Sequence, residues 1–353
     1  MRKTSVAVAA LLLAVPAALA GCGGGGKARV SPVAMPSVPA PTPEPLTPQA
    51  ATQAFQSYIV NDDVARAAGD ERLALSWVSD GQFALTASEY RKAAFDGRQV
   101  ARYTYGRPRL YVPKIEEKTY PQWFVADVRR GVAGASGKDA GGRQTLMGFV
   151  RKSAADGWTL SSTTALAPKA HMPKVLVDAD GYATSLSPTD ASLLIKPRSL
   201  PGIQATIASE GPDSVATGVM RTGAFTTGLY SQTRREVRKA RNLNRQTVVV
   251  ATGFPLFALR AEHGAALVLY ALSRNTTLTP KSGDRDSKPP IPAEVAFLLD
   301  GTVDGNEIDM YETLQMAAYD PGRAKKGATQ AKADVLGQVG GYIKASTPPL
   351  KSP

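Results

Sequence analysis

Cys22 is the residue whose chemistry the sequence specifies most closely. It is the only cysteine of the 353-residue chain, and the segment Leu19–Gly21 stands directly before it. Arg2 and Lys3 open the chain, and an almost wholly apolar run over residues 6–18 follows them. A positive start, an apolar run and small residues at a cleavage point are the three parts of a secretory signal. The sequence therefore predicts export from the cytoplasm.

With a cysteine directly after it, this signal resembles the lipobox of bacterial lipoprotein precursors. The resemblance implies that Cys22 takes a diacylglyceryl group on its sulfur, and that cleavage after Gly21 makes it the new N-terminus. Residues 1–21 are then the signal peptide, whose apolar run is shorter than the roughly 20 residues of a transmembrane helix. We expect a protein anchored by lipid at the outer face of the cytoplasmic membrane, which does not span it.

The segment after the anchor reads as a tether. Four glycines follow Cys22, and seven prolines lie between Pro32 and Pro48 with few charges among them. Proline-rich chain extends by about 3.1 Å per residue, so some 25 residues could reach about 75 Å. We assign residues 22–47 to the lipidated cysteine and its tether, which would let the folded part stand away from the bilayer.

Few residue types for metal or nucleophilic chemistry remain in the mature chain. Since the anchor consumes Cys22, thiolate metal sites, cysteine nucleophiles and disulfides are excluded. The two histidines, His171 and His263, are far apart, and neither G-x-S-x-G nor S-x-x-K occurs. The segment Asp300–Gly305 matches a calcium loop only in part, because Tyr311 occupies the place of the bidentate glutamate. We expect no metal and no cofactor, and a hairpin turn at Asp304-Gly305.

The mature chain is basic. Without Arg2 and Lys3, 40 of the 42 Lys and Arg residues oppose 30 Asp and Glu residues, a net side-chain charge of +10. In the expected location, anionic lipid headgroups and wall polymers are the candidate partners, and nucleic acid is excluded. The densest positive charge is a helical segment with Val237 and Ala240 expected inward, and its cations are Arg234, Arg235, Arg238, Lys239, Arg241 and Arg245. This segment is an anion-binding surface or an ordinary solvated helix face.

Asp127 is the one candidate for a catalytic carboxylate on a strand. It alternates with Trp123 and Val125 on one face of a predicted strand. In a cone-shaped domain such a carboxylate can reach into an apolar cavity and act as a general base. Because Arg129 shares the face, we interpret Asp127 as half of a surface ion pair.

The periodicity of the chain predicts two similar halves. Thr47 and Pro48 have the residue types of a helix N-cap and first turn. In the first half, helical patterns precede period-two runs at 110–112, 122–129, 144–152 and 158–163. In the second half, helical patterns at 203–209 and 226–240 precede runs at 247–251, 256–261, 265–272, 293–299 and 307–317. We place a first domain at 48–166, a linker at 167–189, a second domain at 190–347 and a tail at 348–353.

Helices that precede antiparallel strands indicate an α+β class, with helices packed on a curved antiparallel sheet in each of two tandem domains. This element order resembles NTF2-like or cystatin-like domains. Together with the lipobox and the Ala/Gly/Pro-rich composition, it also resembles uncharacterised two-domain lipoproteins of actinobacteria. That class implies no known activity.

The function expected from the sequence is that of a lipid-anchored, non-enzymatic binding or interaction module of the cell envelope, with an unknown protein partner. Two alternatives stay open, a cavity-based enzyme and a small-molecule carrier of the NTF2-like type. An enclosed apolar cavity would favour both, and an acid–base pair inside it would favour the enzyme.

Overall fold

The computed structural model describes residues 45–137, 141–282 and 287–350. The predicted signal peptide, Cys22 and nearly all of the tether lie outside these residues. The predictions made for them are therefore not addressed by the structure.

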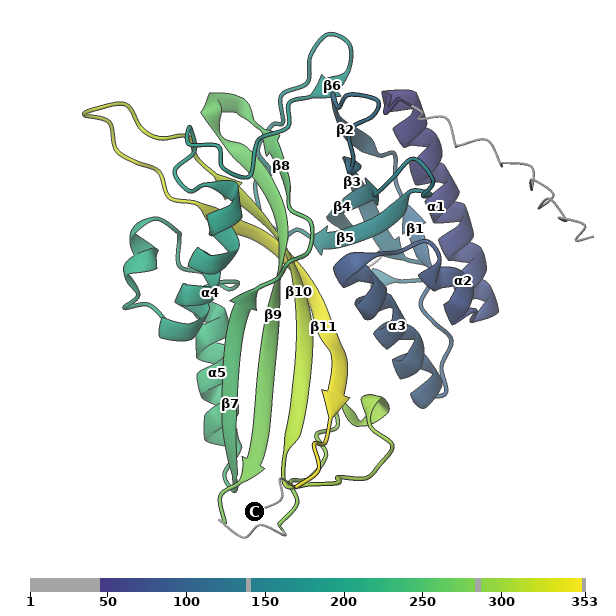
Figure 1. Ribbon diagram of the computed structural model, residues 1–353, viewed down its shortest axis with the longest axis vertical. Helices are drawn as coiled ribbons and strands as arrows, with labels where there is room; N and C mark the ends of the chain where they lie inside the picture. Colours follow the sequence, from purple (N-terminus) through teal and green to yellow (C-terminus); the bar gives the residue numbers. More distant parts are fainter. Residues whose placement is uncertain (1–44, 138–140, 283–286, 351–353) are drawn as a thin grey trace, which may run out of the picture. The chain divides into compact units, whose positions relative to one another are not determined.

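The first half of the described chain places three helices before its strands (Figure 1). They are α1 (Pro48–Ala68), α2 (Glu71–Leu75), α3 (Asp80–Phe95), β1 (Tyr103–Tyr105), β2 (Arg109–Pro113), β3 (Gln122–Val132), β4 (Arg143–Arg151), β5 (Thr159–Ala165) and β6 (Tyr182–Ala183).

The second half repeats this order with longer strands. Its elements are α4 (Leu200–Glu210), α5 (Thr227–Lys239), β7 (Leu243–Ala251), β8 (Phe257–Arg260), β9 (Ala266–Pro280), the 3₁₀ turn η5 (Ala296–Leu298), β10 (Ile308–Asp320) and β11 (Asp334–Ser346).

Helix α1 shows how local sequence sets an element. The Thr47 side chain accepts a hydrogen bond from the Ala50 N–H at 3.0 Å, and Pro48 begins the first turn. The helix stops at Gly69, whose φ of 68° lies in the left-handed region that glycine adopts without strain. The N-cap predicted from the sequence is thus confirmed.

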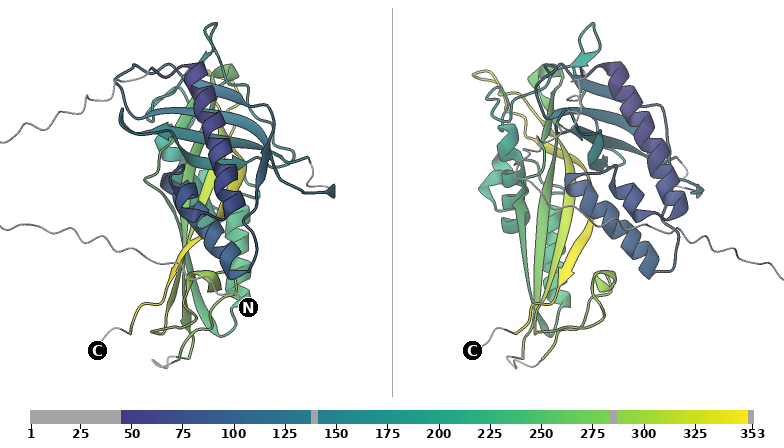
Figure 2. Two further views of the ribbon diagram at one scale, coloured as in Figure 1. Left: turned by 90° about the vertical axis from the view of Figure 1, so that its right-hand side faces the viewer. Right: turned by 45° about the vertical axis from the view of Figure 1, so that its right-hand side comes forward.

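The first sheet has the strand order β5-β4-β3-β2-β6, with β1 paired to β3. Its pairs are antiparallel apart from β2 with β6. Phe55 and Tyr58 of α1 pack on Phe124 and Phe149 of the sheet, and Figure 2 shows α1 lying across the strands. Aromatic burial therefore joins the helical layer to one face of this sheet.

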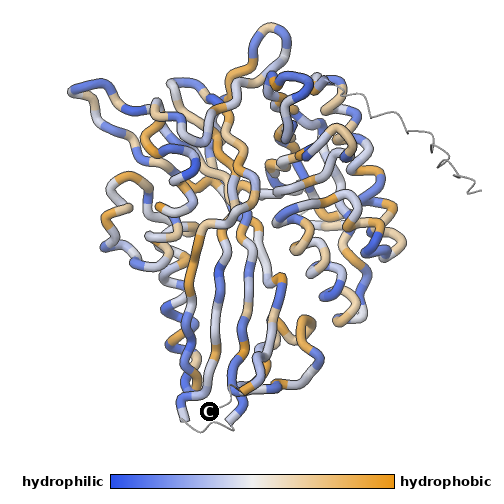
Figure 3. Tube along the Cα trace, viewed as in Figure 1, coloured by the Kyte–Doolittle hydropathy of each residue, from blue (hydrophilic) through white to orange (hydrophobic). Residues whose placement is uncertain are grey.

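The second sheet has the strand order β11-β10-β9-β7, with β8 paired to β9, and all its pairs are antiparallel. Helices α4 and α5 cover one face, where Ile207 and Leu229 pack on Leu272 and Met316. The N-terminal half of β9 is almost continuously buried and hydrophobic (Figure 3). Its C-terminal half alternates buried with half-exposed residues, as expected for a sheet with one open face.

The two sheets also contact each other. Val125 and Leu146 of the first sheet belong to one hydrophobic cluster with Phe257 and Leu269 of the second. Leu166, just after β5, forms an antiparallel bridge with Gly337 of β11. The approach requires glycine, since a Cβ at 337 would lie 2.4 Å from the Ala165 carbonyl oxygen.

The predicted linker over 167–189 takes part in this packing. Val175 and Ser185 form bridges with the second half, and Ala183 of β6 belongs to the first sheet. The division into a first domain at 48–166, a linker and a second domain at 190–347 stays a prediction.

The predicted α+β class with two antiparallel sheets is confirmed, while the likeness to NTF2-like domains stays a prediction. The strand predicted over 293–299 is wrong, because this segment holds the 3₁₀ turn η5 and no strand. Asp304-Gly305 therefore does not join two strands as predicted. Strand β11 was not predicted at all, since the three glycines within it lower its strand propensity.

Candidate functional site

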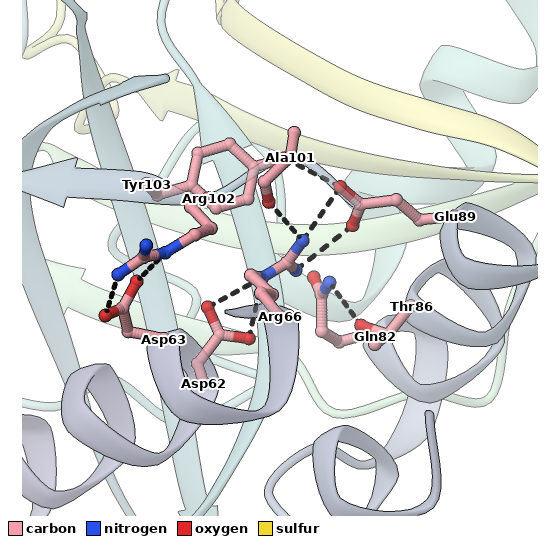
Figure 4. Close-up of polar contacts among 9 residues, drawn as sticks. All are labelled: Asp62, Asp63, Arg66, Gln82, Thr86, Glu89, Ala101, Arg102 and Tyr103. Carbon is pink, nitrogen blue, oxygen red and sulfur yellow. Dashed lines mark hydrogen bonds and ion pairs between the residues drawn. The ribbon is translucent and has the colours of Figure 1, made fainter. Parts of the chain in front are cut away.

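A buried ion cluster joins α1 to α3 (Figure 4). The Arg66 side chain is 2% exposed, and its Nε lies 2.8 Å from an Asp62 carboxylate oxygen one helical turn earlier. Its Nη1 and Nη2 donate to the two carboxylate oxygens of Glu89 at 2.9 and 3.1 Å, and Nη1 also donates to the Ala101 carbonyl at 2.9 Å. A buried guanidinium is costly unless it is paired in this way. These bonds fix Glu89 in one orientation.

Tyr103 and Arg130 extend the cluster from β1 and β3. The Tyr103 hydroxyl donates to Glu89 at 3.0 Å. Its ring receives the Arg130 guanidinium 3.5 Å from the centroid and that of Arg66 at 4.6 Å. Arg130 Nε is buried and has no hydrogen-bond partner among the described residues. The attraction of a cation to an aromatic face is thus the main contact that holds Arg130.

The electrostatics of the cluster follow from burial. Burial raises the pKa of the Asp62 carboxyl, although Arg66 opposes that shift. Burial alone would lower the pKa of Arg66, but the carboxylates of Glu89 and Asp62 raise it overall. Burial also raises the pKa of Tyr105 to about 12. Arg66 therefore stays charged at every physiological pH.

A cleft of about 450 Å³ opens beside this cluster. Both halves of the chain contribute to its walls, which are Gln82, Leu85, Ser88, Glu89, Lys92, Tyr103, Arg130, Thr163, Glu294, Phe297 and residues 339–342 of β11. We call it the central cleft. Its walls carry charges of both signs together with aromatic rings.

The floor of the central cleft is an edge strand. β11 pairs with β10 on one side only, and the Tyr342 carbonyl on its other side accepts a hydrogen bond from Ser88 Oγ. Backbone groups that point to one side of a strand recur every second residue. The backbone groups of Gln338 and Gly340 therefore point to the same side of β11 as the Tyr342 carbonyl. Gly340 is exposed, and its backbone has no partner at this edge among the described residues. The edge is therefore open to pairing.

Asp127 does not form the predicted surface pair. It is 9% exposed, and its carboxylate accepts hydrogen bonds from the Gln144 side chain and the Tyr111 hydroxyl. Burial raises its pKa. The Arg129 guanidinium instead donates to the carbonyls of Gly141 and Gly142 at 3.0 and 3.3 Å. The interpretation was wrong because the partners of Asp127 lie on neighbouring strands, which spacing along one strand does not reveal.

The predicted basic segment is only partly a surface. Arg234, Arg235, Arg238, Lys239 and Arg241 are exposed, and their side chains have no partner in the part of the chain that the structure describes. The Arg245 side chain is 8% exposed and donates to Glu236 at 2.9 Å, so it does not belong with them.

The inward face of α5 also differs from the prediction. Val237 is 38% exposed, and Glu236 points inward, where Arg274 donates to it at 2.6 Å. The attraction of Glu236 to two buried arginines, Arg245 and Arg274, sets the rotation of this helix.

Within 45–137, 141–282 and 287–350, no three His, Cys, Asp or Glu side chains gather as a metal site would require. His171 and His263 are both exposed. Among the helices of these ranges, none is both long and apolar enough to cross a membrane.

Sequence reasoning missed the central cleft and its ion cluster. A signal for the cluster was present, because Asp62 and Arg66 fall near the apolar face that Phe55 and Tyr58 define on α1. Charged residues on the buried side of a helix require partners from elsewhere in the fold. No pattern in the sequence indicated that Glu89 and Arg130 supply the remaining contacts.

Two comparisons relate parts of this chain to known proteins. A family model described as a domain of unknown function (DUF8094) matches residues 43–347. A protein of Streptomyces avermitilis, named an uncharacterised lipoprotein, is 34% identical over 154 residues. That match covers 43% of this chain and 42% of the relative. The predicted resemblance to uncharacterised actinobacterial lipoproteins is confirmed.

Proposed function

The chain belongs to the DUF8094 family of domains of unknown function, and we propose that it is a lipid-anchored, non-enzymatic binding protein of the cell envelope. The lipobox that ends at Cys22 and the relative named as a lipoprotein support the anchor. The outer face of the cytoplasmic membrane is the location that this anchor implies.

One observation carries the proposed binding role. The central cleft has the free edge of β11 as its floor, and it lies where both halves of the chain meet. Gly340 and Gly341 place no side chains over that edge, and the chain just after β5 bonds to β11 further along, at Leu336 and Gly337. A free edge inside a cleft accepts a further strand through main-chain hydrogen bonds.

The occupant that fits this cleft is an extended polypeptide segment. Such a segment offers N–H and C=O groups to Gly340 in the spacing of a β-ladder. Its alternate side chains would meet Lys92 and Arg130, which are cationic, or Glu294, which is anionic and exposed. Phe297 adds an apolar surface. Walls of both signs favour a peptide over a simple ion.

The state of Glu89 supports binding over catalysis. Both of its oxygens accept hydrogen bonds from Arg66, and one accepts a third from Tyr103. A general base needs a carboxylate oxygen that is free to take a proton from its substrate. In this cleft Glu89 has the role of a positioning residue for Tyr103 and the α3 wall.

The test uses the detergent-solubilised lipidated protein and a random twelve-residue peptide library displayed on phage. We expect enrichment of extended, β-prone peptides that carry charges. Exchanging the wall charges with Lys92→Glu and Glu294→Lys should change which charges are enriched. Methylation of alternate backbone nitrogens in a selected peptide should weaken binding at least tenfold, because it removes donors to the edge.

A matched control for Lys92→Glu is Arg235→Glu on α5, which removes the same two units of charge outside the cleft. It should leave the selected peptides unchanged. Two results would contradict the binding role. One is that the same peptides are enriched after the exchange of Lys92 and Glu294, and the other is that no peptide is enriched over the empty support.

The anchor is tested separately by the mass of the N-terminal peptide of the mature protein from its host. The proposal expects that this peptide begins at Cys22 and carries a diacylglyceryl group. A peptide that begins elsewhere, or an unmodified Cys22, would overturn the anchor and leave the cleft proposal standing.

A further inference from the structure

Three arginines surround Asp127 on the face of β3 that points away from the ion cluster. Arg130 and Tyr103 belong to the helix-covered side of the first sheet. Successive side chains along a strand point to opposite faces of the sheet. The side chains of Asp127 and Arg129 therefore lie on the face opposite that of Arg130. This second site is therefore separate from the central cleft.

Strand register assembles the second site from three neighbouring strands. Arg109 of β2 pairs with Asp127 of β3, and Arg129 of β3 pairs with Gln144 of β4. Residues paired across an antiparallel ladder lie side by side on the same face. With Arg107 and Pro108 these residues line an open cleft of about 660 Å³, which we call the arginine pocket.

The charges of the arginine pocket do not balance. Asp127 is its only carboxylate and already accepts hydrogen bonds from Gln144 and Tyr111. The Arg129 guanidinium donates to neutral backbone carbonyls, and Arg107 has no partner among the described residues. Three guanidinium groups thus face one carboxylate, which leaves two positive charges without a counterion among the residues that the structure describes.

We propose that the arginine pocket binds a phosphate group. Guanidinium forks donate paired, charge-assisted hydrogen bonds to phosphate oxygens. A phosphate monoester carries close to two negative charges at neutral pH, which matches the excess in the pocket. The arginine pocket, at about 660 Å³, is large enough for an organic phosphate. The phosphate can come from free inorganic phosphate or from a small organic phosphate monoester.

Calorimetric titrations of the lipidated protein in neutral detergent test the proposal. One arm uses inorganic phosphate and the other glycerol 3-phosphate, and tighter binding in the second arm identifies the esterified source. We expect saturable binding to the wild type. Arg107→Gln should weaken it about threefold, and the double variant with Arg129→Gln at least tenfold.

The matched control is the double variant Arg235→Gln and Arg238→Gln on α5, which removes the same charge elsewhere. It should change phosphate affinity less than twofold. Asp127→Asn should tighten binding two- to fivefold, because it removes the one negative charge of the pocket. Thermal melting checks that each variant folds.

Three results would overturn the proposal. The first is no saturable binding of either probe by the folded wild type up to about 10 mM, which is roughly ten times a Kd of about 1 mM. The second is an equal loss in the α5 control. The third is binding that Asp127→Asn does not tighten.

Discussion

The two halves of the molecule treat a buried carboxylate in different ways. In the first half, Asp62 lies 2.8 Å from the Arg66 guanidinium, which also holds Glu89. In the second half, Asp320 is fully buried, and the only hydrogen bond that its carboxylate accepts from the described residues is a long one of 3.4 Å from the Ile195 N–H. Burial raises the pKa of Asp320 to about 7.

The difference shows how one residue type can fix a site or make a fold sensitive to pH. The paired carboxylates lock α1, α3 and β1 together beside the central cleft, and they need Arg66 to do so. Asp320 has no ion-pair partner among the described residues and is stabilised mainly when protonated. Breaking the first arrangement should cost stability, and removing the second carboxyl should increase stability.

The largest effect is expected from Arg66→Met. This change leaves Asp62 buried without its cation and frees Glu89. Loss of one partner from a buried ion pair costs about 3–5 kcal/mol. Urea unfolding followed by tryptophan fluorescence should show this loss, and a loss below about 1 kcal/mol would contradict the importance of the cluster.

The Asp320 prediction concerns pH. An acid whose folded pKa lies above the unfolded value of about 3.9 stabilises the fold below that value. This contribution is lost as pH rises through the folded pKa, here about 7. Asp320→Asn should therefore raise the free energy of unfolding by about 2–4 kcal/mol at pH 8 and leave it nearly unchanged near pH 3.

Urea unfolding of the wild type and of Asp320→Asn across this pH range is the measurement. The wild type should lose stability between about pH 4 and pH 8 relative to the variant. Two parallel stability curves would show that Asp320 does not titrate as its burial implies.

The same contrast occurs within α5, where Glu236 is paired inward and the outer cations have no partner in the described part of the chain. Replacing the four outer cations Arg234, Arg235, Arg238 and Arg241 with Gln should weaken binding of the detergent-solubilised protein to immobilised polyglycerol phosphate by about two- to tenfold at low salt. The difference should shrink as salt increases.

A matched control replaces four other exposed cations with Gln: Lys118, Lys169, Lys325 and Lys326. If the control weakens binding equally, the attraction reflects net charge alone and α5 is a solvated helix face. If neither set matters, the segment binds no such polymer.

The smallest effect is expected at the exposed pair of Arg102 and Asp63. Its atoms lie 2.6 Å apart, closer than in the buried cluster, but both side chains are more than 40% exposed. Exposed pairs contribute about 0–1 kcal/mol. Arg102→Met should shift the urea midpoint far less than Arg66→Met, and equal shifts would show that burial is not the cause.

Much of the fold could be predicted from local patterns, because caps and periodicity act over a few residues. The N-cap at Thr47 and the antiparallel strands are of this kind. The candidate sites could not, because strand register and helix packing assemble them. Asp127 meets Arg109 through pairing across strands, and Arg66 meets Glu89, 23 residues later in the sequence, through contact between two helices. The glycines of β11, whose edge forms the floor of the central cleft, lowered its strand propensity, so this strand could not be predicted from the sequence.

The central claim is that the central cleft holds an extended polypeptide in the living cell. A photocrosslinking residue in place of Lys92, whose side chain is 52% exposed at the cleft wall, tests it in the intact lipidated protein. The control position is Val215, which is 91% exposed and lies outside the cleft. The account predicts an adduct from position 92 that mass spectrometry resolves to one peptide segment bound along β11. No adduct from position 92, or the same adducts from position 215, would contradict it.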